Sequence, residues 1–236
     1  MKLPISKRLL ACIAQVPTGA RVADIGADHG YLSIELLHSG RATFVHASEL
    51  REQPLKKAVE NARKFGIADR IRFSQADGLA AIDPEQVDTI VCAGMGGDLI
   101  GQILAACPWV KDPKYTLILQ PQSSGNDLRR QLGEMGFGIE KEVLVEDGAF
   151  LYQVLRCRFG NPLELTPGQQ YVSPALLASA DPLLPAYMDR IVQSLTQAVE
   201  GISKATTPRP HLAYYKTALE QVREMRDNYD HSTNHS

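Results

Sequence analysis

The chain has 236 residues and a mass of 25.9 kDa, which fits one large α/β domain or a core of about 150 residues with an appendage. Hydrophobic residues make up 44% of the chain and charged residues 22%, a balance that excludes a wholly disordered, collagen-like or disulfide-scaffold protein. The 25 Lys and Arg residues against 27 Asp and Glu residues give a formal charge of −2, so no overall positive field indicates a polyanionic partner.

No targeting or membrane segment is indicated by the sequence. No apolar run approaches the ~20 residues needed to span a bilayer, and the first eight residues lack the apolar core of a signal peptide. The cysteines show no Cys-x-x-Cys spacing and most lie in apolar runs, as expected of reduced, buried thiols. A cytoplasmic protein without a metal site or an obligate protein partner is therefore expected.

Short apolar runs alternate with longer amphipathic runs over residues 6–158. Residues 6–16 have the apolar spacing of a helix that ends at Pro17 and Gly19. Strands are then predicted at residues 21–25, 43–47, 71–75, 89–93, 115–120, 139–145 and 150–158, and helices at residues 30–38, 54–65, 98–106 and 124–135. Strands separated by helices pair in parallel, and the last two can form an antiparallel edge pair, so the prediction is an open α/β sheet.

The character of the sequence changes after Gly160. Prolines and glycines interrupt the chain up to Pro185, and two stretches with apolar residues three or four positions apart follow. These stretches flank Pro208-Arg209-Pro210 and predict an antiparallel helical hairpin. We therefore expect an α/β domain over residues 1–160 and a small helical, coiled-coil-like domain over residues 161–236.

The loop after the first predicted strand is acidic where a phosphate-binding loop would not be. It reads Asp24-Ile25-Gly26-Ala27-Asp28-His29-Gly30, so its glycines lack the Gly-x-Gly-x-x-Gly pattern that brings a pyrophosphate to a helix N-terminus. Asp24 and Asp28 would repel a phosphate and favour a ligand with cationic groups, such as the amino-acid end of S-adenosylmethionine. A tight turn with a helix-capping Asp is the structural alternative.

Acidic residues also follow the next two strands. Glu49 lies 23 positions after Gly26 (49 − 26), a separation at which a carboxylate accepts from ribose hydroxyls. Asp77 could accept from an adenine amino group, and Gly78 would let the backbone approach the ring. Each residue alone could be a solvated surface acid, whereas together they match different parts of one nucleoside-bearing ligand.

The fourth strand of the sheet leads into a glycine turn, residues 94–97, which reads Gly94-Met95-Gly96-Gly97. So many glycines cost conformational entropy on folding, so a simple connection explains them poorly. Without side chains they offer a surface on which a flat base could lie. Met95 could contact that ligand or belong to the core.

These loops, in this order, resemble one known family. The pattern includes the Asp-His-Gly-Tyr-Leu turn, Ser48-Glu49, Asp77-Gly78-Leu79, the glycine turn and Leu119-Gln120-Pro121. It resembles the bacterial tRNA (adenine-22-N1)-methyltransferase family, which are Rossmann-like class I methyltransferases with a small helical C-terminal domain. The likeness in motifs runs from residue 6 to about residue 160, and the helical tail is similar in architecture only.

The resemblance implies a set of site residues. The methionine portion of S-adenosylmethionine would lie among Asp24, Gly26, Asp28 and Gly30, the ribose at Glu49, and the adenine at Asp77 and Gly78. Tyr31, Leu50 and Gly94 complete the expected cofactor site. The glycine turn would hold the target base. The Asn/Asp-Pro-Pro-aromatic motif of exocyclic-amine methyltransferases is absent, which favours transfer to a ring nitrogen.

The catalysis expected of such a site is mainly positioning, because adenine N1 already carries a lone pair and no proton must be removed before attack. We expect the nucleotide to be everted from the folded tRNA onto the glycine turn. Asp28 could accept from the adenine N6 amino group and favour the positive charge that develops. His29 is a weaker candidate, since a turn histidine can simply bond to the backbone.

RNA contact requires a local basic surface. Phosphate contacts are expected at Lys7, Arg8, Arg209 and Arg223. Further basic groups, at residues 56–72 and at Arg129-Arg130, could equally be solvated helix faces. If the hairpin does not bind RNA, it could mediate dimerisation instead.

Other functions remain open at the level of the sequence. A class I methyltransferase that acts on another RNA or on a small molecule would have the same cofactor loops. A non-catalytic RNA-binding or cofactor-binding module would use the glycine turn only as structure. An NAD-dependent oxidoreductase is disfavoured, because the dinucleotide pattern is missing and Asp28 stands in the phosphate position.

Overall fold

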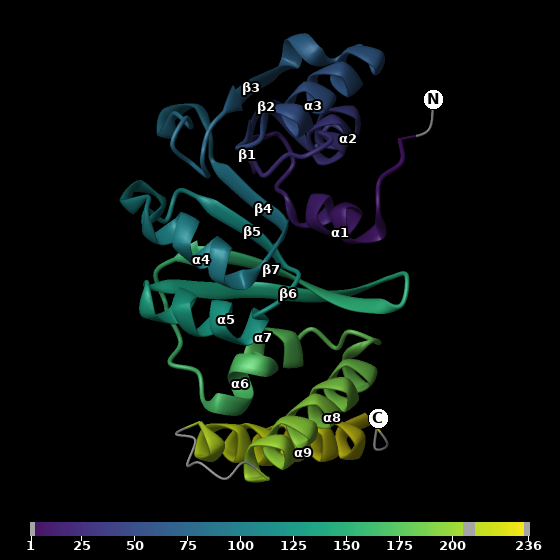
Figure 1. Ribbon diagram of the computed structural model, residues 1–236, viewed down its shortest axis with the longest axis vertical. Coiled ribbons are helices and arrows are strands. Elements are labelled where there is room, and N and C mark those ends of the chain that lie inside the picture. The colour runs from purple at the N-terminus through teal and green to yellow at the C-terminus, as the bar shows by residue number, and fades with distance from the viewer. Residues whose placement is uncertain (1–2, 205–210, 234–236) are drawn as a thin grey trace.

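One sheet organises the molecule (Figure 1). In the computed structural model, which describes residues 3–204 and 211–233, it has seven strands in the order β3-β2-β1-β4-β5-β7-β6. The parallel strands are β1 (Ala20–Ile25), β2 (Ala42–Glu49), β3 (Ile71–Gln75), β4 (Thr89–Met95) and β5 (Thr116–Pro121). The antiparallel strands are β6 (Phe137–Asp147) and β7 (Phe150–Phe159), and β7 pairs with β5. The predicted open α/β sheet with an antiparallel edge pair is confirmed.

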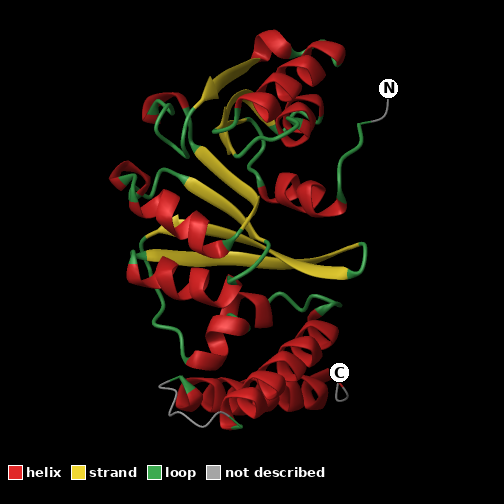
Figure 2. Ribbon diagram, viewed as in Figure 1, coloured by secondary structure: helices red, strands yellow, loops and turns green. Residues whose placement is uncertain are grey.

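Side chains along the central strands point alternately to the two faces of the sheet, and a layer of helices covers each face (Figure 2). Val22, Val91 and Ile118 face one core, whereas their sequence neighbours Ala23 and Cys92 face the other. The first core packs against α1 (Lys7–Gln15), α2 (Tyr31–His38) and α3 (Glu52–Lys64), and the second against α4 (Gly97–Ala105) and α5 (Gly125–Glu134). These elements begin and end within two residues of their predicted bounds. Short 3-10 turns add η1 (Ala68–Arg70), η2 (Pro84–Gln86) and η3 (Pro108–Val110).

The order of the strands creates a switch point between β1 and β4. From β1 the chain proceeds outward to β2 and β3, then returns to place β4 on the other side of β1. In such sheets ligands bind in the crevice outside the carboxyl ends of the strands at this point. The functional site is therefore expected after β1 and β4.

The C-terminal part of the chain is helical and packs around an apolar core that it shares with Leu144 of β6. Its helices are α6 (Pro167–Tyr171), α7 (Pro174–Leu177), α8 (Leu184–Ser203) and α9 (Leu212–Thr233). Arg226 of α9 pairs with Asp189 of α8 (Nε–Oδ1 2.9 Å), and Arg223 donates to Thr196 (3.4 Å), so α8 and α9 run antiparallel. The predicted hairpin is confirmed, whereas α6 and α7 were not predicted. The Pro208-Arg209-Pro210 turn lies outside the described residues.

Buried polar contacts attach the helical part to the sheet. Arg129 of α5 forms an ion pair with Glu142 of β6, and both side chains are fully buried. Glu142 also accepts from Ser173 Oγ (2.6 Å), and Arg129 Nη1 donates to the carbonyl of Gln170 (2.9 Å). Arg129 is therefore not part of a basic surface, whereas Arg130 is exposed and pairs with Glu134 on the surface of α5. No described helix combines the length and apolar character needed to cross a membrane.

Candidate functional site

A cavity of about 440 Å³ lies at the switch point and is called here the switch-point cavity. The loops after β1, β2, β3 and β4 all contribute to its lining, together with α1 and α4. Of the predicted cofactor-site and base-site residues, all but Gly30, Gly96 and Gly97 line this cavity.

Asp24, the last polar residue of β1, points a buried carboxylate into this cavity. Its Oδ2 accepts from Ser33 Oγ at 2.6 Å, and burial raises its pKa from 3.8 to about 6. Burial dominates because removing a carboxylate from water disfavours its charged form, and the Ser33 hydrogen bond only partly offsets this effect. A cation placed here would therefore gain a strong partner.

The turn after β1 depends on left-handed backbone conformations. Gly26 has φ +72°, and a Cβ there would lie 2.9 Å from Met95 Cε. Gly30 has φ +74° and precedes α2, where a Cβ would lie 3.0 Å from that of Ala58. Gly30 is thus needed for the close approach of α2 and α3, which is a structural role.

Asp28 occupies the middle of this turn with φ +44°, a conformation uncommon for residues other than glycine, asparagine and aspartate. Its backbone N–H donates to Glu49 Oε2 at 3.2 Å, and its carboxylate is exposed. His29 Nε2 lies 3.7 Å from Asp28 Oδ2, and its ring stacks on Tyr31 with centroids 5.8 Å apart. The turn therefore presents the exposed carboxylate of Asp28 with the ring of His29 beside it.

Glu49 ends β2 and is 5% exposed. Its Oε1 accepts from the backbone N–H of Arg51 at 3.0 Å and from Arg51 Nε at 3.3 Å. With Asp28 on the other oxygen, the carboxylate is held by three donors, which leaves one lone pair, on Oε2, to accept from a ribose hydroxyl. Leu50 beside it is 59% exposed and forms an apolar wall of the cavity.

The β3 loop places Asp77 and Gly78 on the same cavity. The Asp77 side chain is exposed, and the carbonyl of Gly78 accepts from Ser48 Oγ at 2.9 Å. Gly78 has φ +52°, and a Cβ there would lie 3.2 Å from two carbons of Ile103. Ile103 therefore packs against the loop at Gly78 and adds an apolar contact surface to the cavity.

The glycine turn divides into two parts with different surroundings. Gly94 and Met95 line the cavity. Gly96 and Gly97 instead pack against the loop after β5, where a Cβ on Gly97 would overlap the carbonyl of Ser124, and Gly97 N donates to Ser123 O at 2.9 Å. The surface available to a base is therefore narrower than the sequence indicated.

Arg8 reaches this turn from α1. Its Nη1 donates to Gln120 Oε1 at 2.9 Å, and the same oxygen accepts from Gly94 N at 3.1 Å. Gln120 is fully buried, and its Nε2 donates to the carbonyl of Pro121 at 2.9 Å. The sequence predicted Arg8 as a phosphate contact and included Gln120 in the family pattern, but it did not indicate that Gln120 joins Arg8 to Gly94.

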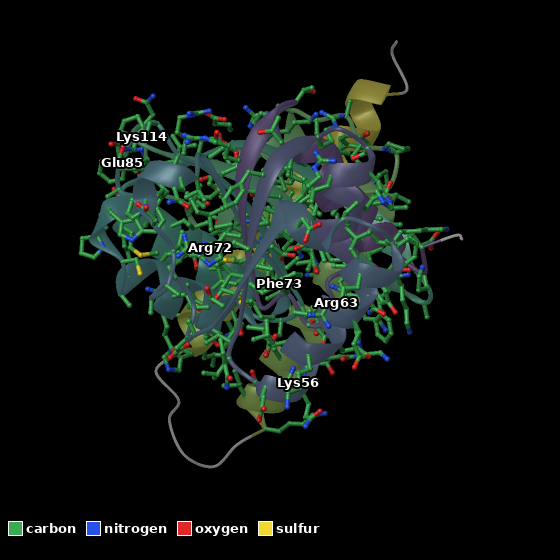
Figure 3. All side chains as sticks on the ribbon, turned by 90° about the horizontal axis from the view of Figure 1, so that it is seen from above. Lys56, Arg63, Arg72, Phe73, Glu85 and Lys114 are labelled. Atoms are coloured by element: carbon green, nitrogen blue, oxygen red, sulfur yellow. The ribbon has the colours of Figure 1, made fainter. Side chains whose placement is uncertain are left out.

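The other basic groups are spread over the molecule. Lys7 and Arg223 are exposed, and Arg209 lies outside the described residues. Lys56 and Arg63 on α3, with Arg72 on β3, lie at the end of the molecule opposite α8 and α9 (Figures 1 and 3). Lys56 pairs with Glu52 at 2.6 Å and Arg72 donates to Gln86 at 3.2 Å, as in ordinary solvated surfaces.

The cysteines are not positioned for chemistry. Cys12, Cys92 and Cys157 are buried and Cys107 is partly buried, and all four are free thiols. Burial raises the pKa of Cys12 and Cys92 to about 12, which keeps them protonated. Within the described part of the chain, no group of three His, Cys, Asp or Glu side chains could hold a metal ion.

The fold and cavity define a class of protein. An open sheet whose switch-point loops carry buried carboxylates, in place of a phosphate-binding glycine pattern, is the arrangement of a Rossmann-like enzyme for a cationic nucleoside cofactor. Residues 5–155 match the family model described as a methyltransferase domain.

Full-length relatives narrow this class. The tRNA (adenine(22)-N(1))-methyltransferase of Bacillus subtilis is 29% identical over 98% of this chain and 99% of its own length. A Streptococcus pneumoniae structure, assigned as a tRNA (m1A22) methyltransferase in complex with S-adenosyl-L-methionine, has a TM-score of 0.81 and 31% identity, covering 94% of this chain and 99% of that chain. The structure of a Streptococcus agalactiae protein of the NADB-Rossmann superfamily has a TM-score of 0.84 and 31% identity, and the match covers 96% of this chain and 99% of that chain. The chain belongs to the methyltransferase-domain family and, within it, to the bacterial tRNA (adenine-22-N1)-methyltransferases.

Proposed function

We propose that this protein methylates N1 of an adenine in tRNA, at position 22 by its family, with S-adenosylmethionine as the methyl donor. The observation that carries the proposal is the convergence of Asp24, Glu49, Asp77 and Gly94 on one cavity of about 440 Å³ at the switch point. Similarity over nearly the whole chain to a tRNA (adenine(22)-N(1))-methyltransferase supports the substrate.

The residues present fit this cofactor. Two buried carboxylates, Asp24 and Glu49, suit a ligand with cationic groups and a diol, and they do not suit a pyrophosphate. When bound, S-adenosylmethionine supplies a methyl group activated by its sulfonium. Asp24, Gly26, Asp28 and Tyr31 would surround the methionine portion, Glu49 and Leu50 the ribose, and Asp77 and Gly78 the adenine. Gly30 would not contact the cofactor and would act indirectly, by setting where α2 begins.

The residues of the chain position the acceptor and do not activate it. Adenine N1 has an in-plane lone pair, so its attack requires alignment and no general base. Gly94 and Met95 provide the surface for the everted base, and Gly96 and Gly97 fix that surface against the loop after β5. Asp28, held in its turn by Glu49, accepts from the N6 amino group and favours the positive charge that develops on the base.

RNA phosphates would contact the exposed side chains of Lys7 and, from the helical domain, residues 161–236, Arg223. Arg209, which lies outside the described residues, is a further expected phosphate contact, whereas Arg8 is held by Gln120 and acts on the glycine turn. The protein acts in the cytoplasm, where its tRNA substrate is found.

The test is to incubate the protein and labelled S-adenosylmethionine with unmodified tRNA transcripts and to map the product by mass spectrometry. We expect 1-methyladenosine at a single nucleotide. Label in ribosomal RNA or in a small molecule alone would identify a different class I methyltransferase. Absence of transfer despite cofactor binding would leave a non-catalytic module, in which the glycine turn is only structural.

A further inference from the structure

A second cavity, of about 410 Å³, lies beyond the carboxyl end of β5 and is called here the hairpin cavity. Its walls are the loop after β5, the start of β7, and residues of α6 and α8. The start of β7 extends past β5, because the pairing of the two strands begins only at Leu155. The hairpin cavity is thus at the same edge of the sheet as the switch-point cavity, and the proposed function does not use it.

Two contacts separate these cavities. The backbone N–H of Gln122 donates to the carbonyl of Met95 at 2.9 Å. The Arg8 guanidinium lies over the Tyr152 ring, 5.9 Å from its centroid, with Arg8 lining one cavity and Tyr152 the other. A molecule in the hairpin cavity is therefore adjacent to the methyl-transfer site but outside it.

The lining of the hairpin cavity combines flat rings with neutral hydrogen-bonding groups. Rings come from Phe150, Tyr152, Tyr171 and Tyr187, and amide groups from Gln122 and Asn126. Phe150 is 64% exposed, which is unusual for a large apolar side chain and marks a surface for contact with a partner. Aromatic faces with amides beside them match the stacking and edge hydrogen bonds of a nucleobase.

The cavity is also formed before any ligand arrives. Gln153 Nε2 donates to Tyr187 Oη at 2.8 Å, and Tyr187 Oη donates to the carbonyl of Tyr171 at 2.9 Å, so its deeper wall is fixed. Among the described residues that line the cavity, Arg129 is the only charged one, and Glu142 neutralises it. A volume of about 410 Å³ is within the usual range for small-molecule sites, so one base with its ribose fits.

We propose that the hairpin cavity binds a second base of the same RNA, a neighbour of the methylated adenine, which stacks on Phe150. This inference rests on the proposed function, because it requires an RNA whose target base is in the switch-point cavity. The wall at Gln122 and Tyr152 means that the base in the hairpin cavity does not react. Its binding would stabilise the everted target by keeping the adjacent nucleotide out of the RNA stack.

The experiment compares Phe150→Ala, Phe150→Tyr and Leu163→Ala with the wild-type protein. Leu163, 51% exposed and near Gly133 and Phe137 rather than the hairpin cavity, is the matched control for loss of a large exposed side chain. Stacking of one base is worth about 1–3 kcal/mol, so we expect Phe150→Ala to raise KM for tRNA about ten-fold. The KM for S-adenosylmethionine should stay unchanged, and Phe150→Tyr should restore KM for tRNA.

A second readout follows the base directly. tRNA with 2-aminopurine next to the target adenine should gain fluorescence on binding to the wild-type protein, because the base leaves the RNA stack, and this gain should be absent in Phe150→Ala. A wild-type KM for tRNA and an unchanged fluorescence gain in Phe150→Ala would overturn the inference while leaving methylation intact. If the wild-type protein transferred no methyl group to tRNA but the fluorescence gain still depended on Phe150, the proposed function would fail and the base site would be retained.

Discussion

Arg8 and Gly94 donate hydrogen bonds to the same atom, Oε1 of Gln120, at N···O distances of 2.9 Å and 3.1 Å. Gln120 cannot turn freely, because it is buried and its Nε2 donates to the carbonyl of Pro121. Helix α1 is thereby connected to the first residue of the glycine turn. The N-terminal helix is consequently part of the wall of the switch-point cavity.

This connection predicts that Arg8→Met lowers kcat for methyl transfer. The substitution leaves Gln120 with one fewer donor, and a hydrogen bond to a charged group of about 1.5 kcal/mol corresponds to roughly ten-fold. Lys7→Met, at the exposed neighbouring position, should instead raise KM for tRNA and reduce its salt dependence. Steady-state kinetics at two salt concentrations distinguish the two. Identical behaviour of both variants would mean that Arg8 is only another phosphate contact.

Asp24 predicts opposite effects on stability and on cofactor binding. Burial raises the pKa of Asp24 to about 6 in the folded protein, from 3.8 in the unfolded chain. The contribution of this group to stability is therefore fully present below pH 3.8 and is lost as the pH rises through about 6. Asp24→Asn is neutral at every pH. Above pH 6 it should therefore raise the Tm and increase the free energy of unfolding by as much as about 3 kcal/mol. The gain should vanish below about pH 4.

The same variant should lose the thermal stabilisation that S-adenosylmethionine gives the wild-type protein, because the cation loses its partner. Thermal melts from pH 4 to pH 8, with and without cofactor, measure both effects. Asp69→Asn, at an exposed position outside the cavity, is the control. A stability difference that does not vary with pH would contradict the assignment.

Asp28→Asn tests the proposed contact with the adenine amino group. Asparagine tolerates the φ of +44° at this position, so the variant removes the charge without straining the turn, as Asp28→Ala would. We expect cofactor affinity near that of the wild-type protein and a single-turnover rate reduced on the order of 100-fold. Calorimetry and quenched-flow measurements check these. Methyl transfer at the wild-type rate would remove Asp28 from catalysis.

The glycine turn predicts a contrast between two alanine substitutions. Gly97→Ala places a Cβ against the carbonyl oxygens of Ser123 and Ser124, so the turn must move and activity should fall. Gly40→Ala meets nothing within 4 Å and has only the strain of its φ of +69°, about 1–2 kcal/mol. Chemical denaturation and methylation assays should therefore show lower stability in both variants and lost activity in Gly97→Ala alone.

Arg223→Glu tests the helical part as an RNA surface. Arg223 is exposed and donates only weakly to Thr196, at 3.4 Å, so reversal of its charge should spare the fold. We expect Arg223→Glu to weaken tRNA binding and to reduce the dependence of the binding constant on salt concentration. Arg70→Glu, at the far end of the sheet, should leave this salt dependence unchanged. If binding were unchanged and the oligomeric state altered, α9 would be a dimerisation element.

The sequence was sufficient for much of this architecture. Short apolar runs between longer amphipathic ones, such as the run at Val22, Ala23 and Ile25, predicted the strands, and the rule for carboxyl ends predicted which loops meet. The placement of β7 between β5 and β6 was not predictable from the pattern, because both strands of the hairpin have apolar residues suited to a buried position.

Long-range polar partners were the main omission. Arg8 and Gln120 are 112 positions apart, and no local pattern connects them. Arg129 followed by Arg130 has the pattern of a solvated basic surface, yet its partner Glu142 comes from a different element and both are buried. Such pairs depend on tertiary burial, which periodicity does not encode.

The contacts of Arg129 and Glu142 bear on how this protein could be divided. Gln170 and Ser173, beyond residue 160, satisfy the buried ion pair that α5 and β6 contribute. A chain truncated near residue 160 would keep every residue of the switch-point cavity but would leave two buried charges short of partners and uncover Leu144. The border between the α/β and helical parts is thus a change of architecture along the chain, and the two parts are expected to fold as one unit.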